Sequence, residues 1–388
     1  LACWESRGWG PSGAMTPLPR RLAAAAPPRG RAAEAHRCAA GRASTRSPAS
    51  LPLSLRLVLL AWVVGALAGS PSGARAAPDY ADPASRVQVT RLENGLTVLT
   101  LEDHTTPTAS LQVWVRVGSG DEARWSGLAH LFEHMMFRGS KNLPPEAHGR
   151  ILGARGAVVN AFTSKDVTVY FENLPSEHLP LALALEAERL ANLDIGEESL
   201  ASERQVVLEE RRMRSEDDPE GRAFEALLAL TWKAHPYRVP TIGWRSDLEK
   251  VGVEAAMAFY RDYYAANNIT LVVVGDFDSG EILGQIEEAF GGLRPAQEIP
   301  RNPTEEPPQL GERRATLRLP VRAPMVALSW HAPPSGSDDA EVLDVASEIL
   351  SGGRTSRLYR RMVYEEAVAL GASGGYWELE RAGVFYAQ

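Results

Sequence analysis

Residues 127–139 read GLAHLFEHMMFRG, an apolar stretch that contains two histidines and a glutamate. His130 and His134 are four positions apart, which in an α-helix places them one turn apart on the same face. Two imidazoles at this spacing can converge on one metal ion, and Glu133 beside them is placed to take a proton from a water molecule at the metal. The stretch therefore predicts a helix that carries a metal site. The alternative is a helix whose histidines only cap or form hydrogen bonds.

A catalytic zinc site needs a third protein ligand, and an acidic helix further along the chain offers candidates. Glu203 and Glu210 are two helical turns apart and share one face, with Val206 and Val207 expected between them on the buried side. Glu209 points about 100° away from Glu210. The alternative is a solvated, charge-rich helix, which fits Glu209 better than the other two glutamates.

Composition and charge limit the possible partners. The chain has 388 residues, of which 44% are hydrophobic and 23% charged, so it can bury a sizeable core. Residues 1–77 hold ten Arg and two acidic residues, which leaves a net charge of −16 on the remainder. An acidic body of this kind disfavours nucleic acid as a partner. The only cysteines, Cys3 and Cys38, lie in this basic leader, so we expect a metal site without Cys ligands and a body without disulfides.

Residues 1–76 are expected to form a leader with a signal peptide. Residues 57–69 (LVLLAWVVGALAG) are apolar and follow Arg56, and Ala74 and Ala76 are small residues of the type that a signal peptidase reads. The pattern predicts secretion across an inner membrane, to a bacterial periplasm. Thirteen residues are too few to span a bilayer of about 30 Å as a helix. An uncleaved membrane anchor and an organelle transit peptide are the alternatives.

The remaining chain alternates between strand and helix patterns. Asn94-Gly95 lies between two short alternating apolar runs and predicts a β-hairpin. Strands are expected at residues 111–117, 158–162, 167–171, 269–274 and 326–330, and helices at residues 126–137, 179–193, 200–213, 279–290 and 339–350.

The domain organisation follows from a proline-rich stretch. Prolines crowd residues 294–320, which predicts an interdomain linker. The order of strand, loop, helix and glycine after this linker repeats that of residues 111–139. We therefore expect an N-terminal metal-binding domain at residues 77–293 and, at residues 321–388, the start of an incomplete C-terminal domain of the same type without metal ligands.

Taken together, several stretches resemble the pitrilysin/insulinase family of zinc metallopeptidases, most of all its secreted bacterial members and the zinc subunit of the mitochondrial processing peptidase. The matching stretches are residues 127–139, 160–164 (NAFTS), 166–170 (DVTVY), 203–210 (ERQVVLEE), 235–237 (HPY), 242–244 (IGW) and 259–276. The resemblance implies an α+β fold of two homologous domains, each a mostly antiparallel sheet packed with helices.

The resemblance also implies a role for individual residues. It implies zinc as cofactor, bound by His130, His134 and Glu210, with Glu133 as the general base, Glu203 as a carboxylate that supports a ligand histidine, and Asn160, Ala161 and Phe162 on an edge strand that holds the substrate backbone. The alternative for the last three residues is a plain edge strand that ends in a turn.

The implied function is that of a zinc-dependent endopeptidase acting on extended peptides or unfolded segments. One departure from the family pattern concerns an Arg and a Tyr that help to hold the substrate, because Val363 and Leu370 stand at the matching positions. We therefore expect a homologous partner subunit to supply these groups in a heterodimer. A homodimer, or substitution by Arg361 or Tyr364, is the alternative. A non-catalytic scaffold or assembly subunit of the same fold is the alternative function.

Overall fold

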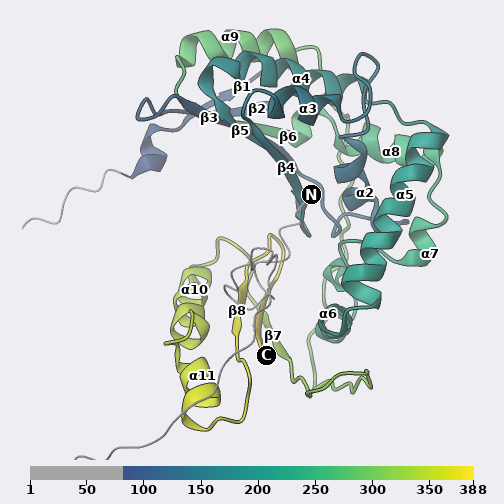
Figure 1. The fold of residues 1–388 in the computed structure, drawn as a ribbon, viewed down its shortest axis with the longest axis vertical. Helices are drawn as coiled ribbons and strands as arrows, with labels where there is room; N and C mark the ends of the chain where they lie inside the picture. The colour runs from purple at the N-terminus through teal and green to yellow at the C-terminus, as the bar shows by residue number, and fades with distance from the viewer. Residues whose placement is uncertain (1–81) are drawn as a thin grey trace, which may run out of the picture. The chain divides into compact units, whose positions relative to one another are not determined.

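Six strands form the larger sheet of the protein (Figure 1). The computed structural model describes residues 82–388, so the predicted leader and signal segment lie outside the described residues. The strands, in spatial order, are β1 (Gln88–Arg91), β2 (Thr97–Glu102), β6 (Ile269–Gly275), β3 (Thr108–Val115), β5 (Thr168–Pro175) and β4 (Val158–Thr163). All neighbouring strands are antiparallel except β2 and β6, which are parallel. The expected mostly antiparallel sheet is confirmed.

The predicted hairpin joins β1 and β2. Leu92 N–H donates to the carbonyl of Leu96 at 2.9 Å across the turn. Gly95 has a φ of 88°, a left-handed conformation that glycine adopts at no steric cost. A Cβ at Gly95 would also lie only 2.9 Å from Cβ of Asn267. The Asn-Gly sequence therefore satisfies both the turn and the close packing next to it.

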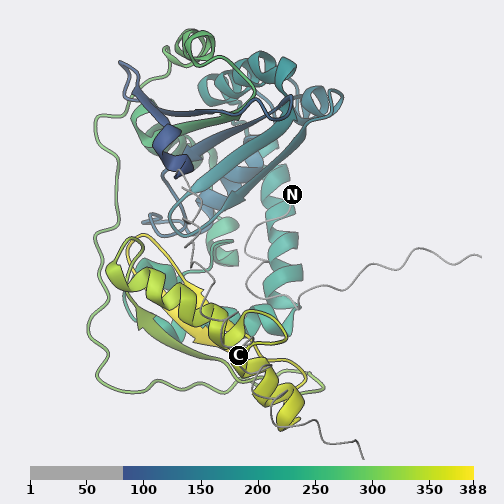
Figure 2. The same ribbon diagram turned by 90° about the vertical axis from the view of Figure 1, so that its left-hand side faces the viewer.

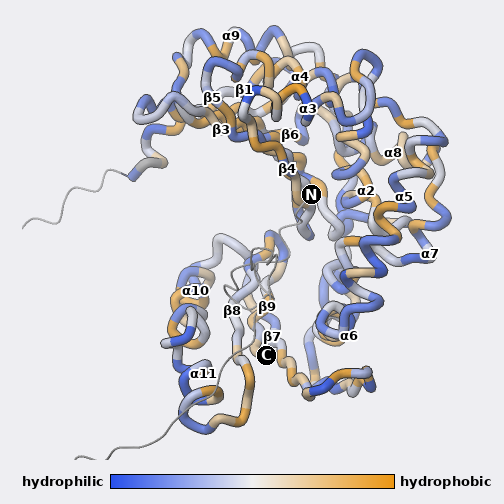
Figure 3. The backbone as a smooth tube through the Cα atoms, viewed as in Figure 1, coloured by the Kyte–Doolittle hydropathy of each residue, from blue (hydrophilic) through white to orange (hydrophobic). Residues whose placement is uncertain are grey.

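Helices cover one face of this sheet and gather at its β4 end (Figure 1). The helices on the face are α3 (Ala147–Gly153), α4 (Leu179–Asn192) and α9 (Ser279–Phe290). Those at the β4 end are α2 (Leu128–Met135), α5 (Glu197–Arg211), α7 (Arg245–Leu248) and α8 (Val253–Tyr263), while α6 (Pro219–Thr231) follows α5. Alternate strand residues such as Leu111, Val113 and Leu271 are fully buried against the helices. Hydrophobic residues, drawn in orange, are frequent in these strands in Figure 3. The apolar core therefore lies between the sheet and these helices.

The start of α2 is fixed by close backbone packing. Gly127 precedes the helix with a φ of 88°, and a Cβ on Gly243 would lie 2.5 Å from Cα of Gly127. The carboxylate of Glu122 accepts the backbone N–H groups of Gly127 and Ala129 at 2.8 and 2.7 Å. These are donors that a helix start leaves without an intrahelical partner. All eight residues of α2 are buried. Packing therefore constrains the rotation of the helix about its axis on every side.

The C-terminal part contains a second, three-stranded antiparallel sheet. Its order is β7 (Leu328–Ala332), β9 (Gly383–Ala387) and β8 (Gly374–Trp377), with α10 (Asp338–Ser351) and the short α11 (Arg357–Tyr359) between β7 and β8. The chain between α9 and β7 has no helix or strand and runs as a long extended connection (Figure 2). No helix within residues 82–388 has the length and apolarity needed to cross a membrane.

Candidate metal centre

Helices α2 and α5 bring His130, His134 and Glu210 together. Nε2 of His134 lies 3.3 Å from Oε2 of Glu210, and Nε2 of His130 lies 3.9 Å from the same oxygen. One ligand atom from each of the three residues lies within 4.8 Å of the other two. Both histidines are buried and Glu210 is partly buried. Two imidazole nitrogens and a carboxylate oxygen thus converge on one point.

The charge states of this group suit a cation. Burial lowers the pKa of His130 to about 3. Burial also acts to lower the pKa of His134, but hydrogen bonds to Glu203 and Glu210 outweigh it and raise this pKa to about 9. For Glu210, burial acts to raise the pKa, and the hydrogen bond to His134 with nearby positive charges outweighs it, so the pKa falls to about 2. An ionised carboxylate therefore faces two imidazoles, and a metal ion would take the place of a proton there.

Glu203 lies on the far side of His134 from Glu210. Its Oε2 is 3.3 Å from Nδ1 of His134, and its side chain is 5% exposed. Its other oxygen, Oε1, accepts from Nε of Arg138 at 2.5 Å. A carboxylate on Nδ1 fixes the imidazole so that its Nε2 lone pair points towards Glu210. The position of Glu203 on the face it shares with Glu210 is predicted from the sequence, whereas no local pattern points to Arg138.

Glu133 is buried beside the two histidines, and Thr163 contacts its carboxylate. The Thr163 hydroxyl, at the end of β4, donates to Oε2 of Glu133 at 2.7 Å. This contact fixes the orientation of a carboxylate that the sequence could only place on the helix. The alternation of β4 could have indicated Thr163, because residues 161 and 163 both point to the side on which α2 lies.

The neighbouring residues of α5 point elsewhere. Glu209 is exposed and pairs with Arg212 at 2.5 Å. Arg214 pairs with Oε1 of Glu210 at 2.9 Å, so it belongs to the surroundings of the cluster. Val207 is fully buried as expected, but the expectation for Val206 is wrong, because its side chain is 43% exposed. The buried stripe of α5 is narrower than the sequence pattern indicated.

Asn160, Ala161 and Phe162 lie on β4, at the edge of the six-stranded sheet. In the described residues β4 pairs only with β5, so its other side is unpaired. Ala161 is buried, whereas Asn160 and Phe162 are partly exposed on the opposite face. The side-chain oxygen of Asn160 accepts the backbone N–H of Ala161 at 3.0 Å. The edge strand therefore ends beside Glu133, which Thr163 contacts.

A second His/Glu group, formed by His148, Glu172 and Glu186, is fully buried elsewhere in the domain. Nε2 of His148 lies 3.3 Å from a carboxylate oxygen of each glutamate. Arg189, however, already donates to both oxygens of Glu186 and stacks over Tyr170. A divalent ion beside this guanidinium would leave excess positive charge in a dry site. The group therefore fits a buried ion-pair network better than a metal centre.

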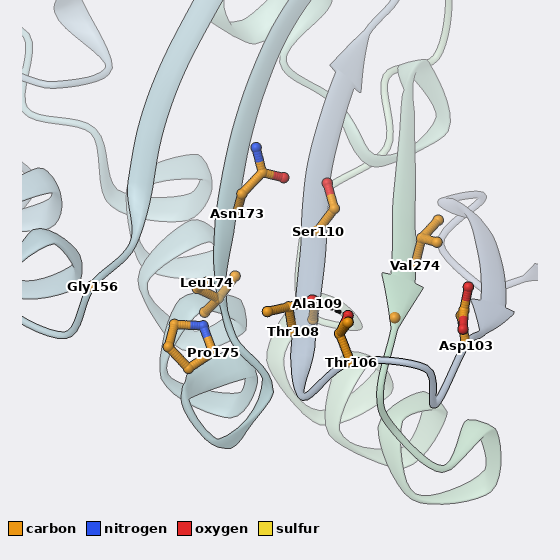
Figure 4. A pocket seen from close by; sticks show the side chains of 11 residues that line it. Asp103, Thr106, Thr108, Ala109, Ser110, Gly156, Asn173, Leu174, Pro175 and Val274 are labelled. Carbon is orange, nitrogen blue, oxygen red and sulfur yellow. Dashed lines mark hydrogen bonds between the residues drawn. The ribbon is translucent and has the colours of Figure 1, made fainter.

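Figure 4 shows a cavity at the ends of strands β3, β5 and β6. Its volume is about 540 Å³. It is lined by Asp103, Thr106, Thr108, Ala109, Ser110, Gly156, Asn173, Leu174, Pro175, Val274 and Gly275. Thr108 pairs with Pro175 at this end of β3 and β5, whereas Thr168, the partner of Thr163, lies at the other end. The cavity contributes no residue to the metal cluster.

The donor set fits zinc. Two imidazole nitrogens and one carboxylate oxygen are the protein ligands of many catalytic zinc sites, which keep a fourth position for water. Both histidines also present the same ring nitrogen, Nε2, to Oε2 of Glu210, so that all three ligand atoms face one position. Fold and site together define an α+β protein with a buried two-histidine, one-glutamate centre on facing helices.

Comparison with known proteins gives the family. Residues 97–244 match the model of insulinase (peptidase family M16), and residues 250–388 match that of the peptidase M16 inactive domain. A zinc protease, PqqE, from Helicobacter pylori is 32% identical over 299 residues, which cover 76% of this chain and 67% of the relative. A probable mitochondrial-processing peptidase subunit beta from Schizosaccharomyces pombe is 31% identical over 55% of this chain and 47% of its own. The chain belongs to the insulinase family of peptidases, M16.

Solved structures agree with this membership. The crystal structure of a protease from Helicobacter pylori has a TM-score of 0.76 and 31% identity, covering 78% of this chain and 74% of that one. A putative M16-like peptidase from Alicyclobacillus acidocaldarius has a TM-score of 0.69 and 25% identity, covering 78% and 73%. The chain spans about two thirds of the length of the Helicobacter pylori zinc protease and 47% of that of the Schizosaccharomyces pombe subunit. The resemblance inferred from the sequence motifs and the expected pair of related domains are both confirmed.

Proposed function

We propose that this protein is a zinc-dependent endopeptidase that hydrolyses extended peptides or unfolded segments. The observation that carries the proposal is the convergence of His130, His134 and Glu210, with Glu133 oriented beside them. The zinc protease relatives support the same cofactor. His130, His134 and Glu210 would hold the ion, and Glu203 would orient His134.

The chemistry assigns one task to each residue. Bound zinc would polarise the scissile carbonyl and lower the pKa of the attacking water. Glu133 takes the proton of this water and then passes it to the leaving amine. Thr163 fixes the carboxylate of Glu133 at 2.7 Å, so proton transfer needs no large reorientation of the side chain.

Substrate binding in this proposal uses the free edge of β4. An extended peptide can add to an exposed strand edge through backbone hydrogen bonds, which gives affinity with little side-chain selectivity. The N–H of Ala161 now bonds to the side chain of Asn160, and an incoming strand would take over this donor. Phe162, on the exposed face of the same strand, would contact side chains of the bound peptide.

The full enzyme in this proposal contains a homologous partner subunit. The yeast relative is named as a subunit of a processing peptidase, which supports an assembly of two related chains. The alternative to this heterodimer is a homodimer of two copies of this chain. We also propose a periplasmic location, supported by the leader pattern at residues 57–76 and by a periplasmic protease from Escherichia coli of the same fold. The boundaries at residues 77–293, 294–320 and 321–388 remain part of the proposal.

The test of the catalytic proposal is the Glu133→Gln variant. It should fold and keep about one zinc per chain, yet lose about 10²–10⁴-fold in kcat, because only the proton acceptor is removed. Metal analysis and hydrolysis of an unstructured peptide, with any required partner present, measure the two properties. A variant that hydrolyses the peptide at the wild-type rate would exclude Glu133 as the base. Wild-type protein without zinc would instead favour the scaffold function.

A further inference from the structure

Arg138 connects the end of the metal-binding helix to the carboxylate that orients one of its histidines. It follows α2 by one turn, and its backbone N–H bonds to the carbonyl of Met135 at 2.9 Å. Its guanidinium contacts Oε1 of Glu203 through two nitrogens, with Nε at 2.5 Å. The other oxygen of Glu203 lies 3.3 Å from Nδ1 of His134. Arg138, Glu203 and His134 thus form one continuous chain of contacts.

The geometry gives each oxygen of Glu203 one task. A carboxylate that is 5% exposed is costly to bury unless a cation and hydrogen bonds compensate it. Two nitrogens of the planar Arg138 guanidinium hold the single oxygen Oε1, whereas a Lys would offer one point charge. With Oε1 held by Arg138, the other oxygen, Oε2, is directed towards the imidazole of His134. Without Arg138, nothing else described bonds to Oε1.

We propose that Arg138 is a positioning residue for the metal centre, acting on zinc through Glu203 and His134 without touching the ion. The inference rests on the proposed zinc site and adds a residue to it. For the loss of Arg138, positioning and simple electrostatics predict opposite changes in zinc affinity. Removing a positive charge near a cation site should tighten cation binding if charge alone mattered. Loss of positioning should weaken it.

The test compares zinc affinities of purified full-length variants by competition with a chromophoric chelator. Arg138→Met should weaken zinc binding by about 10–100-fold, the usual effect of losing a partner that orients a ligand histidine. Arg138→Lys, which keeps the charge but loses the planar guanidinium, should fall between this variant and the wild type. The absorption spectrum of the cobalt-substituted protein should change in the Met variant, because the geometry around His134 is altered.

A double-mutant comparison separates positioning from general stability. If Arg138 acts through Glu203, then zinc binding by the variant that combines Arg138→Met with Glu203→Gln should equal that of Glu203→Gln alone, because contacting residues are not additive. Glu146→Gln is the matched control. Glu146 bonds to the same guanidinium at 3.1 Å but is 76% exposed and has no contact with His134, so its loss should leave zinc affinity within about twofold.

Two results would overturn the inference. One is unchanged or tighter zinc binding by Arg138→Met in a folded protein, and the other is full additivity of the two substitutions. Wild-type protein that binds no zinc would overturn the proposed function itself. Failure of the proposed function can therefore be distinguished from failure of the inference about Arg138.

Discussion

Two adjacent glutamates on α5, Glu209 and Glu210, differ in exposure and in the groups they contact. Glu210 faces the histidines and is 17% exposed, whereas Glu209 is 56% exposed and pairs with Arg212. The separation follows from the turn of about 100° per residue in an α-helix. The lowered pKa of Glu210, caused mainly by its hydrogen bond to His134 acting against burial, keeps it ionised at neutral pH. Only one of the two carboxylates can therefore act as a ligand.

Glu210→Gln should lower zinc affinity by more than about 100-fold, beyond the effect expected for a residue that only supports a ligand. Glu209→Gln, one position away with the same change in charge, is the control and should leave affinity nearly unchanged. Chelator competition measures both. If Glu209→Gln empties the site and Glu210→Gln does not, the register of α5 against α2 is wrong.

At the scale of elements, the proline-rich segment after α9 contacts the rest of the chain at several points, and Glu306 makes one of these contacts. The carboxylate of Glu306 accepts the backbone N–H groups of Lys233, Ala234 and His235 at 2.7–3.0 Å and lies 3.3 Å from a nitrogen of Arg313. Burial acts to raise the pKa of Glu306, but the three N–H groups outweigh it and lower the pKa to about 2. The extended segment therefore has a specific contact with the turn that follows α6.

This contact predicts a pH-dependent stability. Glu306→Gln should reduce the free energy of unfolding by about 1–3 kcal/mol at pH 7, the range for hydrogen bonds to a charged group. Because the folded-state pKa lies below the usual 4.5, the stabilisation is present above that pH and is lost as pH falls towards 2. Urea unfolding at several pH values should show the variant and wild type converging in this window. Glu305→Gln, on an exposed neighbour, is the control and should show no such convergence.

At the scale of the molecule, two of the stretches that carried the family resemblance contact the C-terminal strands. Asp166 accepts from the Tyr237 hydroxyl and from the backbone N–H of Glu380, between β8 and β9. The N–H of Arg381 donates to the oxygen of Tyr237 at 3.1 Å, and Trp232 lies in the same apolar cluster as Leu379 and Val384. These motif residues therefore connect the segments around Asp166 and Tyr237 to the C-terminal strands, and they take no part in the metal cluster.

The second half of the catalytic site is predicted to come from another chain. Val363 and Leu370 stand where the family pattern has an Arg and a Tyr, and neither can donate to a substrate oxygen. Alone, the full-length protein should bind zinc but cleave peptides about 10²–10³-fold more slowly than the complete enzyme. Titration with a homologous partner that has both residues should raise activity to saturation. Full activity of a strictly monomeric or homodimeric preparation would contradict the split site and point to Arg361 or Tyr364.

The sequence by itself determined the features that depend on local geometry. The four-residue spacing of His130 and His134 fixes their shared face, because helical hydrogen bonds act over one turn. The Asn94-Gly95 turn and the alternation of β3 are local in the same way, and the joint motifs identified the family. The seven-residue spacing of Glu203 and Glu210 placed both on the side of α5 that meets α2.

Only the tertiary structure decided which distant groups meet. The parallel pairing of β2 with β6 joins residues more than 170 positions apart, and no local pattern specifies such a partner. The contacts of Arg138 with Glu203, of Thr163 with Glu133 and of Glu306 with a distant turn arise in the same way. Val206 became exposed because the width of a buried stripe depends on what packs against the helix. Side-chain contacts of this kind result from the packing of whole elements, so they appear only when the chain has folded.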